Sequence, residues 1–367
     1  MPKWMRSDSP APWNAPLLGR IGGCTNPESA ELLADGERFV FGNCAMMVGH
    51  PAYRAGQGLV YLAGQAFVSR ARIDAQGVHM EAERVVAGLT GTLGCDLLPV
   101  GTARFPAGTV FMAEGGRPVT EPGAAVLVEH VRPRIIAFDP LRGTVHGSIP
   151  LWEGSAIAAK FNALDQPNGL AIDAQGNLYV GDIPNSNPHD FLPAPVPSAV
   201  YRIPRGSLDA LALEAAGAAD AVERIEIPGW VNGIAAARDE DAVWFGSCSF
   251  HCPAGGGAFR LAPQDFRRGA LPEPAVRGMG LIDGIGLSRR GTLFLSTPMT
   301  GELHAFRADG AHFVVKTGGE NPVRMPADFN ICYPNVLGGE PAALVTDISV
   351  GMPPGDGSVA VVDLSGL

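Results

Sequence analysis

The chain has 367 residues, of which 46% are hydrophobic and 17% charged, and this composition excludes an intrinsically disordered chain. A formal net charge of −10 provides no basic surface for a phosphate backbone, so we expect neither nucleic acid nor an anionic membrane as a partner. The 48 glycines and 32 prolines favour many short elements joined by tight turns, as in an all-β protein.

The N-terminal segment lacks the apolar core and the small-residue cleavage site of a secretory signal peptide. We interpret residues 1–17 as an arm and residues 18–367 as a single domain, and we expect a cytoplasmic protein. No stretch approaches the roughly 18 apolar residues that a membrane span needs. The six cysteines fit reduced thiols better than a disulfide framework, although export would allow a bridge between Cys24 and Cys44.

One pattern recurs along the chain. A polar residue is followed by a short apolar run, a polar turn and a second apolar run that ends in small or polar residues. The copies are clearest at 167–182 (PNGLAIDAQGNLYVGD), 231–247 (VNGIAAARDEDAVWFGS) and 282–297 (IDGIGLSRRGTLFLST), and weaker at 27–43, 95–115 and 327–347. Each copy predicts two short strands joined by a turn.

The intervals between successive copies leave room for two further strands in each unit. Residues 124–140, 198–204 and 301–310 have the apolar patterns of such strands. Six four-stranded sheets arranged radially form a six-bladed β-propeller. A β-sandwich or a β-helix would use strands of the same kind, but the regular spacing favours the propeller. We therefore predict an all-β fold, a six-bladed β-propeller with a central channel.

In a propeller, the innermost strand of each blade lines the channel, so polar residues at one point of several copies would face a common axis. Glu28, Asn168, Asn232 and Asp283 occupy that point. Two carboxylates and two carboxamides suit Ca²⁺ better than a metal that prefers thiolate or imidazole, with Mn²⁺, Mg²⁺ and Zn²⁺ as alternatives. Asn-Gly and Asp-Gly are also ordinary turn dipeptides, but their repetition in register favours a metal site in the channel.

The motifs PES, PNGLAID, VNGIA and the DG of IDGIGLS resemble those of the SMP-30/gluconolactonase-like calcium-dependent hydrolases, relatives of diisopropylfluorophosphatase and the paraoxonases. The resemblance extends from about residue 18 to about residue 350. It implies a six-bladed propeller, a divalent metal in the channel and hydrolysis of lactones or related esters. It places the metal ligands of the family on Glu28, Asn168, Asn232 and Asp283.

The family pattern is not followed throughout. The first copy has ESAELL where the family has E-G-P-x-W, and the second copy is unlike the common sugar-lactonase pattern. The resemblance therefore assigns no substrate contacts. In the family, the aspartate that corresponds to Asp283 is proposed as a general base or as a nucleophile, and the sequence does not separate these roles. Asp96 and Asp328 are further candidate acids, which we place at the matching points of the second and sixth copies.

Other motifs offer weaker chemistry. No G-x-S-x-G, H-E-x-x-H or P-loop motif is present. The stretch CSFHC, residues 248–252, has the composition of a small zinc knuckle but lacks a second pair of ligands. His50, His189 and His251 lie in predicted loops near the channel, where a surface or hydrogen-bonding role is the simpler interpretation.

We therefore expect a metal-dependent hydrolase of a small lactone or ester, with a small-molecule substrate as its partner. Two alternatives stay open. One is a non-hydrolytic propeller enzyme, such as a lyase, isomerase or condensing enzyme, that uses the same channel. The other is a binding propeller with structural calcium. The sequence gives no indication of oligomeric state.

Overall fold

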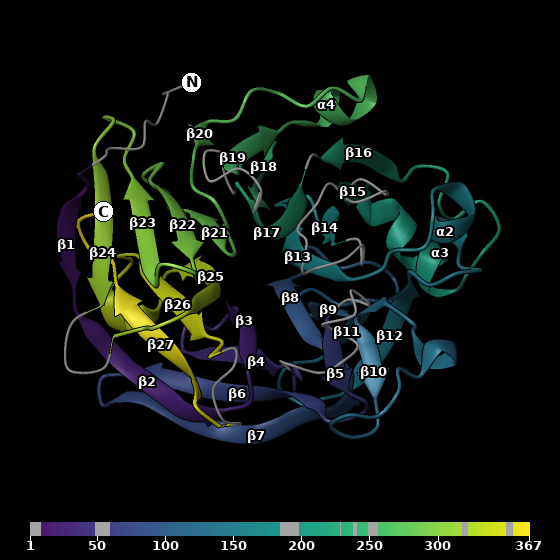
Figure 1. Ribbon diagram of the computed structural model, residues 1–367, viewed down its shortest axis with the longest axis horizontal. Helices are drawn as coiled ribbons and strands as arrows, with labels where there is room; N and C mark the ends of the chain where they lie inside the picture. The colour runs from purple at the N-terminus through teal and green to yellow at the C-terminus, as the bar shows by residue number, and fades with distance from the viewer. Residues whose placement is uncertain are drawn as a thin grey trace.

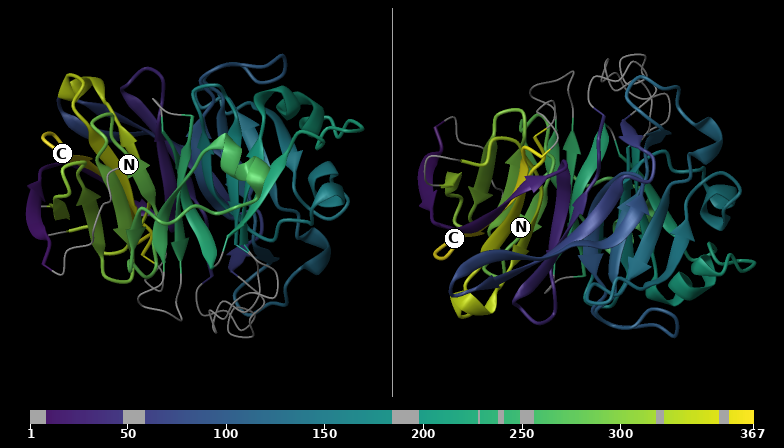
Figure 2. Two further views of the ribbon diagram at one scale, coloured as in Figure 1. Left: turned by 90° about the horizontal axis from the view of Figure 1, so that it is seen from above. Right: turned by 90° about the horizontal axis from the view of Figure 1, so that it is seen from below.

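Six antiparallel sheets are arranged around a central axis, which confirms the predicted six-bladed β-propeller (Figure 1). The computed structural model describes residues 9–47, 59–183, 198–227, 229–237, 241–248, 256–317, 322–349 and 355–367. Viewed from the side, the strands of the blades run between the two faces of a disc (Figure 2).

Each blade has four strands in antiparallel order from the channel outward. Blade 1 consists of β3 (Pro27–Leu32), β4 (Arg38–Asn43), β6 (Ala66–Asp74) and β7 (Gly77–Leu89), and blade 2 of β8 (Thr92–Leu97), β9 (Val110–Glu114), β11 (Arg134–Phe138) and β12 (Val145–Pro150). Blade 3 consists of β13 (Pro167–Ile172), β14 (Leu178–Asp182), β15 (Ser198–Ile203) and β16 (Glu223–Ile227), and blade 4 of β17 (Trp230–Ala236), β18 (Val243–Cys248), β19 (Gly257–Leu261) and β20 (Val276–Arg277). Blade 5 consists of β21 (Ile285–Leu287), β22 (Leu293–Thr297), β23 (Glu302–Phe306) and β24 (His312–Thr317), and blade 6 of β25 (Pro326–Cys332), β26 (Ala342–Asp347), β27 (Gly357–Asp363) and β2 (Leu17–Cys24).

The N-terminal segment closes the ring. Strand β2 pairs with β27 and so provides the outermost strand of blade 6, which joins the beginning of the domain to its end. Strand β1 (Ala11–Ala15) lies in the segment that we interpreted as an arm, and it adds a fifth, parallel strand to blade 5 by pairing with β24. The ring is thus held by pairing between segments far apart in the sequence.

The remaining elements are short. Helices α2 (Ala156–Lys160), α3 (Leu208–Ala212) and α4 (Pro263–Arg268), with the 3-10 turns η1 (Val128–His130), η2 (Arg205–Ser207) and η3 (Asn335–Leu337), lie in connections. A two-stranded parallel sheet joins β5 (Val60–Leu62) to β10 (Arg117–Val119) outside the blades. None of the described helices is long and apolar enough to cross a membrane.

The hydrophobic core is divided among the spaces between blades. Six buried clusters each combine side chains of two neighbouring blades, such as Phe39 and Phe41 of blade 1 with Leu344 and Val361 of blade 6. Each sheet is therefore buried on both faces, which explains why the inner strands are apolar runs rather than alternating ones. Strand β13, for example, is buried at every position.

The inner strands approach one another so closely that glycine is needed between them. A Cβ on Gly169 would overlap the Asn232 carbonyl oxygen of the next blade, and one on Gly233 would overlap the Asp283 carbonyl oxygen. The glycine of each NG or DG dipeptide thus allows the contact between blades. The pairing between the inner and second strands is interrupted at the NG dipeptide itself, between Pro167 and Leu170 in blade 3. Such a bulge changes the direction in which a side chain points.

The predicted strand pairs of all six copies are confirmed, as are strands within 198–204 and 301–310. The prediction for 124–140 was partly wrong, because only Arg134–Phe138 forms a strand. Pro133 has no N–H for a ladder. The residues before it instead form η1 and return to β10, where the Leu127 N–H donates to the Pro118 carbonyl at 2.9 Å.

We expect Gly169→Ala to destabilise the fold by about 2 kcal/mol or more, because the added methyl group must displace the neighbouring inner strand. Gly22→Ala is the matched control, since a Cβ at Gly22 meets nothing within 4 Å. Urea unfolding of both variants in excess EDTA measures the fold alone. Equal unfolding midpoints for the two variants would show that the close approach does not need glycine.

Candidate metal centre

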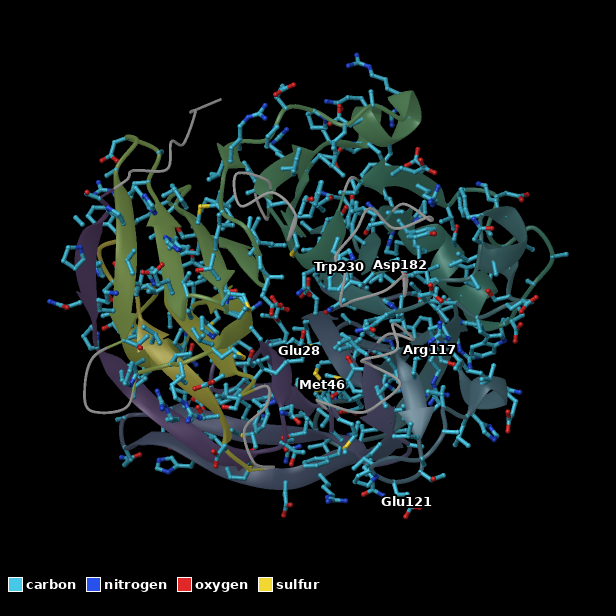
Figure 3. All side chains as sticks on the ribbon, in the orientation of Figure 1. Glu28, Met46, Arg117, Glu121, Asp182 and Trp230 are labelled. Atoms are coloured by element: carbon cyan, nitrogen blue, oxygen red, sulfur yellow. The ribbon has the colours of Figure 1, made fainter. Side chains whose placement is uncertain are left out.

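Six residues occupy equivalent positions on the inner strands and form a ring around the channel, here called the inner ring. Carbonyl contacts between successive blades define the equivalence. From blade 1 to blade 6, the residue after each ring position meets the ring carbonyl of the next blade, and Thr346 of blade 6 meets the Glu28 carbonyl of blade 1. In blade order the inner ring consists of Glu28, Leu93, Asn168, Asn232, Asp283 and Ala327. The structure thus brings together the four residues that the sequence singled out, and Figure 3 shows Glu28 near the middle of the propeller.

Hydroxyl groups fix the backbone of the ring. The Ser29 Oγ donates to the Leu93 carbonyl at 2.7 Å, and the Ser296 Oγ donates to the Ala327 carbonyl at 2.6 Å. The Thr346 Oγ1 lies 2.8 Å from the Glu28 carbonyl oxygen. These contacts are buried and link neighbouring strands, so they hold the ring residues at fixed positions.

The ring carboxyl groups are buried and incompletely hydrogen-bonded. Glu28 is 3% exposed and Asp283 7%, while Asn168 is 5% exposed and Asn232 is partly buried. The Glu28 Oε2 and Asp283 Oδ1 atoms have no hydrogen-bond partner among the described residues. Buried polar atoms are nearly always satisfied, so two such acceptors in one channel are suited to binding a cation or a hydrogen-bond donor.

Burial and mutual repulsion both act against ionisation of these groups. The pKa of Glu28 is raised well above its ordinary value by desolvation and by the charges of Asp283 and Asp328, and the Asn168 carboxamide opposes the shift. Desolvation raises the pKa of Asp283 to about 7. A cation between the two carboxylates would reverse both effects by compensating their charge.

The donor set fits a hard divalent cation. Histidine, cysteine, aspartate and glutamate alone form no metal-binding group of three or more in the described part of the chain. The ring instead combines two carboxyl groups with two carboxamides, and all of these provide the oxygen atoms that Ca²⁺ prefers. The four side chains come from four blades, and the ring positions of blades 2 and 6 are held by the apolar residues Leu93 and Ala327.

Asp96 and Asp328 do not lie at ring positions. The sequence-based prediction that they occupy the matching points of blades 2 and 6 was therefore wrong. Leu93 and Ala327 hold those points, so Asp328 is one residue and Asp96 three residues farther along their strands. The pKa of Asp328 is raised well above its ordinary value, mainly by desolvation and further by the charge of Asp283. The Asp96 Oδ2 accepts from the Ile172 N–H at 2.6 Å.

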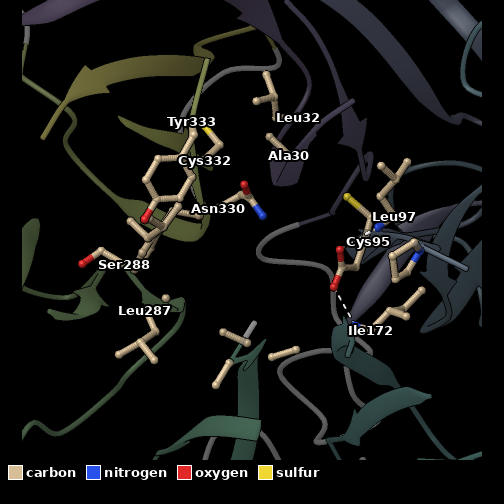
Figure 4. Close-up of a pocket in the computed structure, with 18 of the residues that line it drawn as sticks. Ala30, Leu32, Cys95, Leu97, Ile172, Leu287, Ser288, Asn330, Cys332 and Tyr333 are labelled. Carbon is tan, nitrogen blue, oxygen red and sulfur yellow. Dashed lines mark hydrogen bonds between the residues drawn. The ribbon is translucent and has the colours of Figure 1, made fainter. Parts of the chain in front are cut away.

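A cavity of about 700 Å³ lies where the inner strands end (Figure 4). Its wall combines apolar side chains, such as Leu32, Leu97 and Leu287, with polar ones that include Asp96 and Asp328. The ring residues lie near the other end of the inner strands, where the chain enters each blade. The second-to-third-strand connections at that end lie partly outside the described residues in blades 1, 3, 4 and 6.

Carboxylates and amides at the ends of the second strands hold the chain as it enters the inner strands. The Asp182 Oδ1, at the end of β14, accepts from the Asp165 and Gln166 N–H groups at 3.0 and 2.9 Å. The Asp347 side chain binds the N–H groups of Arg324 and Met325 in the same way in blade 6. The polar endings of the second apolar runs were visible in the sequence, but their role as anchors was not.

The sequence analysis also missed Tyr61 and Gln166. Both are fully buried beside the ring, and the Gln166 Nε2 donates to the Tyr61 Oη at 3.1 Å. Tyr61 lies in an insertion of blade 1 that has no counterpart in the repeat, so the repeat contained no signal for it. Gln166 directly precedes the PNG motif and could have been found there.

The described cysteines are all buried, and no disulfide joins any two of them: Cys24, Cys44, Cys95, Cys248 and Cys332. Cys24 and Cys44 therefore form no bridge with each other. The Cys44 Sγ instead donates to the Asn26 carbonyl at 3.0 Å. Cys252 and the three loop histidines, His50, His189 and His251, lie outside the described residues.

Comparison with solved structures finds the same propeller in other proteins. A gluconolactonase from Xanthomonas campestris has a TM-score of 0.51 and 16% identity, with 95% of this chain and 88% of that chain covered. A luciferin-regenerating enzyme has a TM-score of 0.54 and 11% identity, with 94% of each chain covered. The calcium-binding protein regucalcin from Agrobacterium tumefaciens has a TM-score of 0.52 and 11% identity, with 96% of this chain and 95% of that chain covered.

No protein-family model matches the chain, and no curated protein matches its sequence. At 11–16% identity, the structural likenesses establish the fold. A shared fold does not by itself show which substrate or metal this chain binds.

We expect Asp182→Asn to stabilise the protein more at pH 8 than at pH 5. Burial raises the pKa of Asp182 to about 7. The folded state therefore keeps a proton that the unfolded state releases above pH 4, and wild-type stability falls as the pH rises toward 7. Asparagine retains an oxygen acceptor for the two N–H groups and has no charge to bury.

Urea unfolding of the wild type and of Asp182→Asn at both pH values measures the effect as a double difference. We expect a value on the order of 2–4 kcal/mol. A difference between the two proteins that does not change with pH would contradict the raised pKa.

Proposed function

We propose that this protein is a calcium-dependent hydrolase of a lactone or related small ester, similar to the SMP-30/gluconolactonase-like enzymes. The observation that carries the proposal is the pair of unmatched carboxylate oxygens, on Glu28 and Asp283, in one ring with Asn168 and Asn232. A purely structural propeller does not require convergent oxygen ligands at its axis.

The structural neighbours support the proposal. One is a gluconolactonase and another is a calcium-binding protein, so the same propeller accommodates lactone chemistry and calcium in other chains. The PNG, VNG and DG motifs also resemble the metal-binding motifs of the SMP-30/gluconolactonase-like family, and the resemblance places a family ligand on Asn168, Asn232 and Asp283.

The four ring residues would hold the cation, which would polarise the carbonyl oxygen of the substrate. Glu28 and Asp283 compensate the charge, and the two asparagines provide neutral oxygens. Asp283 is also the candidate base or nucleophile. Its pKa of about 7 is suited to a group that exchanges a proton near neutral pH, although a bound cation would lower that pKa again.

Removal of the metal provides the first test. We expect EDTA to abolish hydrolysis of lactones and aryl esters and Ca²⁺ to restore it, because the ring offers only hard oxygen ligands. Isothermal titration of the chelated protein should show one calcium bound per chain. Chelator-resistant activity in a protein without a divalent ion would overturn the proposal, and calcium binding without any turnover would favour a binding propeller.

Asp283→Asn separates metal binding from chemistry. It keeps one oxygen ligand but removes the charge and the proton acceptor, so we expect kcat to fall by at least about 100-fold while calcium binds only modestly more weakly. Asn168→Ala should show the reverse, with a larger loss of calcium affinity than of kcat at saturating calcium.

Asp328→Asn is the control for a buried channel carboxyl outside the inner ring, and we expect it to retain most of the turnover. Near-normal kcat in calcium-loaded Asp283→Asn would limit Asp283 to the role of a ligand. The base would then have to be sought at Asp328 or Asp96.

A further inference from the structure

Blade 2 contributes no oxygen to the inner ring, but a polar pair lies directly beside its ring position. Leu93 stands between Glu28 of blade 1 and Asn168 of blade 3, and it is fully buried. Tyr61 comes from β5, which Met46 joins to the end of blade 1 through an isolated bridge.

The Tyr61 ring is seated between two glycines of blade 2. A Cβ on Gly91 would come within 3.2 Å of the ring, and one on Gly116 would overlap it. Both glycines have positive φ, +65° and +99°, so neither position readily accepts another residue. The hydroxyl therefore has a fixed position. Tyr61 and Leu93 belong to the same buried cluster. Desolvation raises the pKa of Tyr61, and the charges of Cys44, Glu28 and Asp283 add to the shift.

Gln166 is held at both its backbone and its side chain. Its N–H donates to the Asp182 Oδ1 at 2.9 Å, and its Nε2 donates to the Tyr61 Oη at 3.1 Å. Only Pro167 separates it from Asn168. Gln166 is fully buried, and its Oε1 has no hydrogen-bond partner among the described residues.

The pair is left with one unmatched acceptor and one unmatched proton. Tyr61 accepts from Gln166, and the described residues offer no acceptor for its own proton. Turning the amide over would let Tyr61 donate to Oε1 but would leave Nε2 without an acceptor. One polar atom of Gln166 is unmatched in either orientation, and a buried polar atom left in this way costs about 1–3 kcal/mol.

We propose that Tyr61 and Gln166 form a binding site for one O–H group at the blade 2 side of the metal centre. An O–H group both donates and accepts, so it satisfies the Gln166 amide in either orientation and the Tyr61 hydroxyl. A carbonyl oxygen would satisfy the pair only with the amide turned over, by accepting from Nε2, and an ammonium group would match only Oε1 in the observed orientation.

The O–H group has two sources, an ordered water molecule or a hydroxyl of the substrate. In the second case the pair determines specificity, because a site built to hydrogen-bond a hydroxyl discriminates against an analogue that lacks it. The assignment of a substrate hydroxyl rests on the proposed lactone hydrolysis. The assignment of an ordered water molecule does not depend on it.

The test uses Tyr61→Phe and Gln166→Met, which remove the polar atoms and nearly keep the volumes. Tyr201→Phe is the control. Tyr201 belongs to the same buried cluster as Tyr61, and its hydroxyl accepts from the Arg224 Nε at 3.2 Å. The kcat/KM of each calcium-loaded protein is compared on glucono-δ-lactone and on δ-valerolactone, which lacks the hydroxyl groups. Crystals of the calcium-loaded wild type and of Gln166→Met, both without substrate, provide the second readout.

For a substrate hydroxyl, we expect both variants to lose about 10-fold or more of the preference for the hydroxylated lactone, with δ-valerolactone turnover retained and Tyr201→Phe unchanged. A purely structural role would lower both activities equally. For water, we expect an oxygen atom bonded to both Tyr61 and Gln166 in the wild type and absent in Gln166→Met.

Unchanged preference in both variants, together with no oxygen atom between the two side chains, would overturn the inference. If neither lactone is hydrolysed by the wild type, the proposed function fails. The crystallographic readout still decides the O–H site in that case. Either variant is sufficient if the other does not fold.

Discussion

The close approach of the six inner strands is the constraint on which the rest of the structure depends. Where Gly169 faces Asn232 and Gly233 faces Asp283, there is no room for a side chain between one strand and the next. This tight ring brings side chains from four blades to one axis. It also sets the bulges that turn those side chains inward, so that packing and ligand geometry have a common cause.

The same packing buries charge that the fold alone does not compensate. Glu28, Asp283 and Asp328 share one channel, and each has a pKa raised by desolvation. Groups of this kind destabilise a protein when they ionise, so their presence at the axis is explained by function rather than by stability. A bound cation would turn mutual repulsion into attraction. Binding of the proposed cation would therefore be coupled to folding stability.

The ring is not symmetric. Side chains with oxygen atoms come from blades 1, 3, 4 and 5, whereas blades 2 and 6 contribute Leu93 and Ala327 on either side of Glu28. Beside Leu93, the Tyr61–Gln166 pair provides polar groups that do not belong to the repeat. The two ends of the channel differ as well, because anchors such as Asp182 hold the entering chain at one end and a cavity with both apolar and polar walls lies at the other. The repeat thus forms the scaffold, and departures from it shape the site.

The sequence by itself determined the blade count and the common position of Glu28, Asn168, Asn232 and Asp283 on four blades, because both are local patterns repeated in register. The sequence pattern placed Asp96 and Asp328 at ring positions, but the structure places Asp328 one residue and Asp96 three residues beyond them. The weak copies differ in the lengths of their turns and bulges, so equivalent positions cannot be aligned by sequence there. The sequence contained no sign that β1 and β2 complete blades 5 and 6, or that Tyr61 comes to lie beside Glu28. Those relations join segments far apart in the chain, and only the packing of the closed ring decides them.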